Sequence, residues 1–201
     1  DTALKNRDVW IALVPAGQFS SNFCKALEHC PTWQAVFINN KQKLFVDWST
    51  EQGKKLFDGV LTGETKYPDE FTRHLNLARF YLAYVNTDGA KKIGLDHAIK
   101  AMEENPSPIP MLEIVGVAAR YSGLSGEIKR FCEALFKDFE AKRSEYARQD
   151  GYRARLEAAR LACAYLQNIA IAQKDNGAAN MYTDRVGDYA AERDWQTTTM
   201  K

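Results

Sequence analysis

Basic and aromatic side chains stand next to one another at several points in the second half of the chain. The pairings are Arg120 with Tyr121, Lys129 and Arg130 with Phe131, Arg143 with Tyr146, and Tyr152 with Arg153. Single-stranded nucleic acid is bound by cations along its backbone and by aromatic faces that stack on its bases. The pattern therefore favours binding of single-stranded RNA. Aromatic side chains in a core beside solvated cations give the same pattern, and for any single pair that is the simpler interpretation.

No catalytic or metal-binding motif accompanies these residues. The sequence has no glycine-rich phosphate loop, no dinucleotide fingerprint, no zinc-protease motif and no nucleophile elbow. The histidines His29, His74 and His97 are far apart in the sequence, so we expect them to have structural roles. The sequence thus predicts neither an enzyme nor a bound cofactor or metal, and no small-molecule substrate.

The cysteines do not form a metal or redox motif. Cys132 and Cys163 fall on apolar helical stripes and are expected to be buried. Cys24 and Cys30 could form a disulfide in an oxidising compartment, but nothing else favours secretion, so we expect reduced thiols. No apolar run approaches the ~20 residues that a membrane span needs, and no charged-then-apolar pattern predicts a signal peptide in the given sequence.

Residues 125–173 carry the strongest pattern and must position most of the basic residues. Apolar residues recur at steps of three and four on both sides of Gly151, which predicts two helices joined as a hairpin. Ser125 is expected to cap the first of them. The outer faces of this hairpin are basic.

The rest of the chain predicts a mainly α fold with a two-lobed helical core. We expect an N-terminal arm at 1–48 with short strands or a helix, including a small β-hairpin around Asn39. The helical core covers 49–175, with Asp96 starting one of its helices and a joint between lobes at the proline-rich 105–110. Residues 176–201 lack apolar spacing and predict an extended C-terminal arm.

The order of short motifs resembles the coat proteins of flexuous filamentous plant RNA viruses, the potyvirus-like ones above all. Residues 110–114 (PMLEI) and 136–139 (FKDF) look like the two motifs that enclose one RNA strand in that family, and 153–155 (RAR) is similar to a later basic helix. Residues 78–89 resemble the family's core helix and polar loop. Glu113 stands where the family has its RNA-facing arginine. The resemblance implies that Arg120 or the Lys129–Arg130 pair supplies that charge and that Asp138 orients it, with Arg153 and Arg155 on the later helix.

The leading hypothesis is therefore a structural coat protein that polymerises around single-stranded RNA through its terminal arms, in a virion or the host cytoplasm. The formal net charge of +1 predicts weak binding per subunit, which salt would weaken further. The alternative is an all-helical protein–protein interaction module of the immunity or adaptor type, cytoplasmic and without a nucleic-acid role. A helical enzyme with an inconspicuous site is a third possibility.

Overall fold

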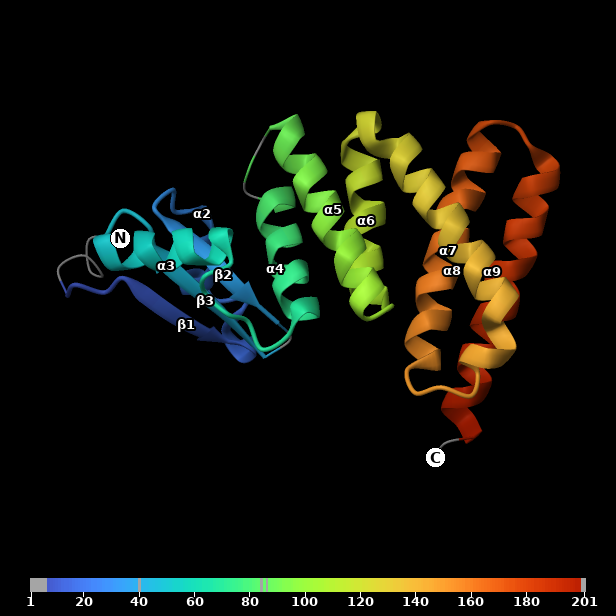
Figure 1. The fold of residues 1–201 in the computed structure, drawn as a ribbon, viewed down its shortest axis with the longest axis horizontal. Coiled ribbons are helices and arrows are strands. Elements are labelled where there is room, and N and C mark those ends of the chain that lie inside the picture. The colour runs from blue at the N-terminus through green and yellow to red at the C-terminus, as the bar shows by residue number, and fades with distance from the viewer. Residues whose placement is uncertain (1–6, 40, 84, 86, 200–201) are drawn as a thin grey trace.

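The computed structural model of the chain describes residues 7–39, 41–83, 85 and 87–199. A small sheet with two helices forms one end of the molecule, α4 to α6 lie side by side next to it, and α7 to α9 form the other end (Figure 1). Most elements are helices, so the mainly α prediction is confirmed. None of the helices in the described ranges has the length and apolar character required to cross a membrane.

The sheet has three antiparallel strands in the order β1-β3-β2. They are β1 (Ile11–Pro15), β2 (Trp33–Ile38) and β3 (Gln42–Asp47). The predicted hairpin is confirmed as β2 and β3, and the Asn39 side chain accepts hydrogen bonds from the N–H groups of Lys41 and Gln42 at the turn. The short 3-10 helix η1 (Ala16–Gln18) follows β1.

Helices cover both faces of the sheet. The helix α2 (Asn22–His29), capped by Ser21, packs its Cys24 and Leu27 against Phe45 on one face. On the other face, α3 (Glu51–Thr62) and α4 (Glu70–Ala83) share a core with the sheet. The expectation of an N-terminal arm is therefore wrong for the described part of residues 1–48, because Val14 and Phe45 on one face and Val36 and Val46 on the other are buried against helices.

The main core lies between α4, α5 (Asp88–Glu104), α6 (Pro108–Arg120) and the two helices that follow. The start of α5 lies eight residues before the predicted Asp96, because the Thr87 hydroxyl accepts a hydrogen bond from Ala90 N–H and caps the helix there. Residues 105–107 of the proline-rich segment form a turn between α5 and α6, and residues 108–110 are the first residues of α6. Met102 before it and Met111 after it are both buried in this one core.

The predicted helical hairpin is confirmed as α7 (Ser125–Tyr146) and α8 (Tyr152–Ala172), which follow the 3-10 turn η2 (Ser122–Leu124). Gly151 has a φ of 81°, a conformation that glycine adopts without steric cost. The predicted cap at Ser125 is wrong, since its hydroxyl donates to the Ser122 carbonyl instead. Cys132 and Cys163 are buried, as predicted.

The predicted extended C-terminal arm is wrong, because residues 176–199 form the helix α9 (Asn176–Thr199). Tyr182, Val186 and Tyr189 are spaced by four and three residues and pack against α7 and α8. The Asp175 carboxylate accepts a hydrogen bond from Ala178 N–H at the start of the helix. Packing onto the hairpin therefore stabilises a helix whose own sequence is only weakly amphipathic.

Candidate functional site

The residues predicted to bind RNA lie at several places in the fold. Arg120, at the end of α6, is exposed, and its Nε donates to the Gly116 carbonyl at 3.0 Å. It lines a hollow of about 630 Å³ together with Lys91 and Lys92. Lys91 is buried: its Nζ donates to the Leu82 carbonyl at 2.7 Å and lies 4.9 Å from the centre of the Tyr121 ring. The Tyr121 face is thus occupied by a cation of the same chain.

The α7–α8 hairpin brings two of the predicted residues together. Asp138 accepts hydrogen bonds from Lys142 at 2.7 Å and from Tyr146 at 2.6 Å, and these bonds lower its pKa below the usual range. The Arg155 guanidinium lies 4.9 Å from the centre of the same Tyr146 ring. Asp138 and Arg155 therefore both contact Tyr146, across the two helices.

Lys129 and Arg130 lie on the first turns of α7. Lys129 is half-buried and forms an ion pair with Glu133 at 3.7 Å, whereas Arg130 is exposed. Phe139 stacks on Tyr146 and Tyr152, so several aromatic rings of the hairpin already have aromatic partners. RNA binding by these residues stays a prediction.

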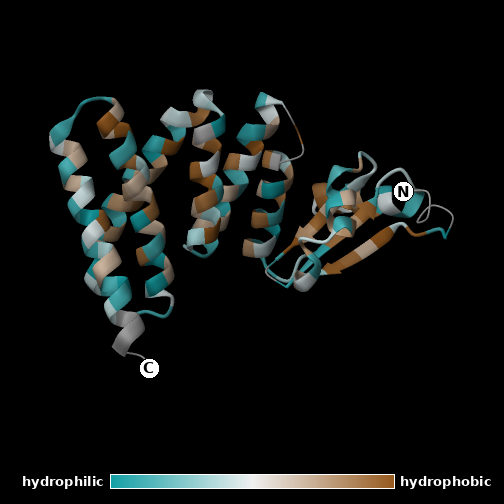
Figure 2. Cartoon of the chain, turned by 180° about the vertical axis from the view of Figure 1, so that it is seen from behind, coloured by the Kyte–Doolittle hydropathy of each residue, from teal (hydrophilic) through white to brown (hydrophobic). Residues whose placement is uncertain are grey.

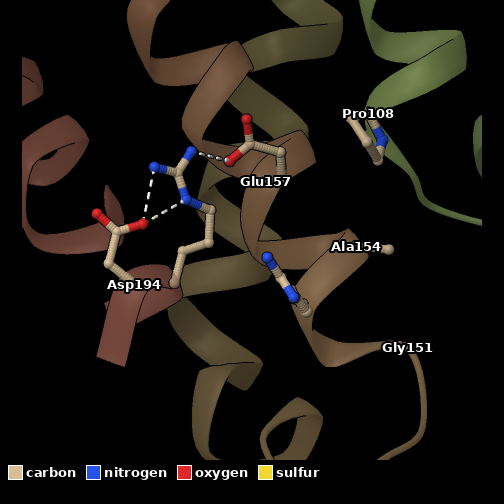
Figure 3. A pocket seen from close by; sticks show the side chains of 7 residues that line it. Pro108, Gly151, Ala154, Glu157 and Asp194 are labelled. Atoms are coloured by element: carbon tan, nitrogen blue, oxygen red, sulfur yellow. Dashed lines mark hydrogen bonds and ion pairs between the residues drawn. The ribbon is translucent and has the colours of Figure 1, made fainter. Parts of the chain in front are cut away.

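Arg153 lines a separate hollow of about 890 Å³ between the start of α6, the start of α8 and α9 (Figure 3). Arg193 lines it as well and forms ion pairs with Asp194 at 2.9 Å and with Glu157 at 3.4 Å. Arg160 and Arg193 lower the pKa of Glu157, mainly through the hydrogen bond from Arg160. Acidic and basic side chains thus face the same hollow, and it has no clear preference for an anion.

A third hollow, of about 550 Å³, is a groove formed by α4, α6 and the end of β2. Five apolar side chains line it: Ile38, Phe71, Leu75, Ile109 and Leu112. Ile109 and Leu112 are 45% and 55% exposed and lie one turn apart on α6, so two exposed aliphatic side chains stand together at this groove. We call this surface the α4–α6 groove.

The polar side chains of the α4–α6 groove are already engaged by the protein itself. Arg79 Nε on α4 and Glu113 Oε1 on α6 form an ion pair at 2.8 Å. The Asn76 amide accepts from Ile38 N–H at 2.5 Å and donates to the Thr72 carbonyl at 2.8 Å. Because these groups have internal partners, the surface that remains to bind a ligand is mainly apolar.

No local sequence pattern predicts this groove, because its walls come from segments far apart in the chain. One signal was present in α6. Met111, Ile114 and Val117 form its core-facing stripe, yet Ile109 and Leu112 add apolar side chains on another face. A helix that is apolar on more than one face needs more than one packing partner. Glu113, which interrupted the resemblance to viral coat proteins, is the ion-pair partner of Arg79.

Two histidines that are far apart in the sequence meet between α4 and α5. The Nδ1 atoms of His74 and His97 are 2.9 Å apart, and the His97 ring stacks on Tyr81. His74 Nε2 also lies 3.7 Å from a Glu70 carboxylate oxygen. No group of three or more potential metal ligands occurs among the described residues. The Nδ1 contact requires one ring to donate and the other to accept.

This histidine pair should make the fold sensitive to acid. Burial, followed by the nearby positive charges of His74, Lys100 and Arg73, lowers the pKa of His97 to about 4. The unfolded chain takes up its proton near pH 6.5, so stability falls as the pH drops from about 6.5 towards 4. We expect a loss of roughly 1–2 kcal/mol after allowing for solvent screening.

Urea unfolding at pH 7 and at pH 5 measures this loss. His97→Phe keeps a ring against Tyr81 but cannot be protonated, and it should flatten the difference between the two pH values. An equal difference in wild type and variant would show that another group is responsible.

Comparison of the chain with protein-family models, with curated proteins and with solved structures finds no match.

Proposed function

We propose that this protein is a protein–protein interaction module that holds an apolar segment of a partner in the α4–α6 groove. The observation that carries the proposal is the exposure of Ile109 and Leu112 beside Phe71 and Leu75 on two packed helices. Apolar surface of this kind, bordered by satisfied polar groups, is typical of recognition sites.

The groove is held in place by its own contacts, so a partner meets a preformed surface. The Arg79–Glu113 ion pair joins α4 to α6, and Asn76 joins α4 to the end of β2. A preformed site loses little conformational entropy when a partner binds. The exposed rim would leave a small ligand partly in water, whereas a segment anchored in a larger partner can cover it.

Selection from a library of displayed random peptides tests the proposal. We expect the wild-type protein to enrich peptides with closely spaced aliphatic or aromatic side chains. Ile109→Asp with Leu112→Asp should weaken their binding by about tenfold or more, equivalent to about 1.4 kcal/mol. The control is Ile93→Asp, because Ile93 is similarly exposed, at 43%, on α5 but does not line the groove.

Two results would contradict the proposal. In the first, the enriched peptides bind the double variant as tightly as they bind the wild type. In the second, selection on the wild type enriches no peptides beyond those that selection on the double variant enriches. Binding of single-stranded RNA that Lys129→Glu with Arg130→Glu abolishes would instead favour the RNA-coat hypothesis.

A further inference from the structure

The two outer edges of the sheet differ in whether their outward-facing backbone groups have hydrogen-bond partners. At the edge formed by β2, Ile38 N–H donates to Asn76 at 2.5 Å and the Tyr67 hydroxyl donates to the Val36 carbonyl at 2.6 Å. Side chains of α4 and of the segment before it therefore bind the backbone groups that another strand would use. This edge is closed to a further strand.

The opposite edge, formed by β1, lies along the outer margin of the sheet, away from α4 (Figure 1). Asp47 N–H donates to the Trp10 carbonyl and Ala16 N–H donates to the Lys41 carbonyl. The even-numbered residues of this segment therefore direct their backbone N–H and C=O groups towards β3. Backbone groups alternate in direction along an antiparallel strand. The N–H and C=O groups of Ile11 and Leu13 must then point away from the sheet.

Within the described part of the chain, the side chains of β1 also lack the usual protection of an edge strand. Ile11 and Leu13 are 38% and 59% exposed, and residues 11–14 contain no charge. Figure 2 shows hydrophobic residues along this outer strand. Natural sheets generally protect such an edge with charges, bulges or a covering element. Pro15 has no N–H to donate, so the part of β1 that can hydrogen-bond fully with another strand ends before it.

We infer that β1 pairs with β1 of a second copy of this chain, antiparallel about a two-fold axis at Ala12. In this register Ile11 faces Leu13 of the second copy, and each such pair exchanges two backbone hydrogen bonds, giving four in total. The exposed side chains of Ile11 and Leu13 cover one another. A two-fold axis at Leu13 instead places Pro15 opposite Ile11, and each such pair forms one hydrogen bond in place of two because Pro15 has no N–H.

The edge fits a copy of itself, because each exposed apolar side chain of one β1 lies opposite an exposed apolar side chain of the other. A five-residue strand buries much less than the ~800 Å² per partner of a stable complex. The dimer should therefore be weak and reversible. This interface is separate from the α4–α6 groove and does not depend on its function.

Sedimentation velocity of the full chain across a concentration series tests the dimer. We expect wild type to shift from monomer to dimer, and Leu13→Lys to stay monomeric over the same range because it places a charge on the edge. Ile93→Lys on α5 is the matched control and should dimerise like wild type, with far-UV circular dichroism confirming that both variants fold. A wild type that stays monomeric at about millimolar concentration, or a Leu13→Lys variant that still dimerises, would overturn the inference.

Disulfide trapping tests the register in a Cys30→Ser background. Ala12→Cys should cross-link under mild oxidation, since opposed residues of a non-hydrogen-bonded pair have Cα atoms about 4.5 Å apart. Ile11→Cys and Leu13→Cys should not, because each lies about 8 Å from its own copy, beyond the reach of a disulfide. Cross-linking through Leu13→Cys in preference to Ala12→Cys would contradict the register.

Discussion

Replacing Tyr189 by alanine is expected to lower the free energy of unfolding by about 3–5 kcal/mol, the range for removing a large aromatic side chain from a core. Tyr189 is fully buried at 0% exposure, and its ring meets Phe139 edge-on at 5.4 Å. Its hydroxyl donates to Glu140 at 2.5 Å, and this carboxylate also pairs with Arg185 at 2.8 Å. The variant leaves a cavity at the point where α9 meets α7. Urea unfolding followed by circular dichroism measures the loss.

Two further variants separate packing from hydrogen bonding. Tyr189→Phe keeps the ring and should cost only about 1 kcal/mol, because Glu140 retains Arg185 as a partner. Met181→Ala on the same helix removes a side chain that is 43% exposed and should change stability by less than about 1 kcal/mol. If Tyr189→Ala were as mild as Met181→Ala, α9 would not depend on this contact.

Replacing Gly53 by alanine is expected to cost at least about 3 kcal/mol, at the upper end of the usual penalty for overpacking. A Cβ atom added there would lie 2.0 Å from the Asp47 carbonyl oxygen and 2.9 Å from Thr50 Oγ1. The clash is with backbone at the end of β3, which cannot rotate away. Asp47 is itself buried and accepts hydrogen bonds from the Ser49 N–H and hydroxyl. Thermal unfolding of the variant measures the effect.

The control for Gly53 is Gly126, which also lies in the first turn of a helix, α7. A Cβ atom there meets no atom within 4 Å. Gly126→Ala should therefore be neutral or stabilising by roughly 0.5–1 kcal/mol, because alanine restricts the unfolded chain more than glycine does. Similar destabilisation by both alanine substitutions would point to helix N-terminal geometry in general and away from the contact with Asp47.

The parts of the fold that sequence reasoning predicted are those fixed by local pattern. The two stripes on either side of Gly151 give α7 and α8, and Asn39 between apolar runs gives the β2–β3 hairpin. Each of these depends on residue spacing within one or two dozen residues. The start of α5 was not predicted correctly. Thr87 caps this helix by accepting a hydrogen bond from Ala90 N–H, and this contact is seen only in the structure.

The parts that sequence reasoning missed depend on contacts between distant segments. The spacing of Tyr182, Val186 and Tyr189 is helical, but polar residues between them hide it, and the packing against α7 and α8 decides the outcome. The α4–α6 groove likewise joins Phe71 to Leu112, and no local pattern indicates that they share a wall. Tertiary contacts override local propensity in both cases.

The late position of Tyr189 in the sequence has a consequence for the protein during translation. Phe139 and Tyr152 leave the ribosome first, and the surface they share with Tyr189 stays open until α9 has been made. At about 5–20 residues per second, the 24 residues of α9 take roughly one to five seconds. During that interval the nascent chain presents an aromatic surface to the cell. A slow stretch of codons in α9 would lengthen that exposure and increase the chain's dependence on chaperones.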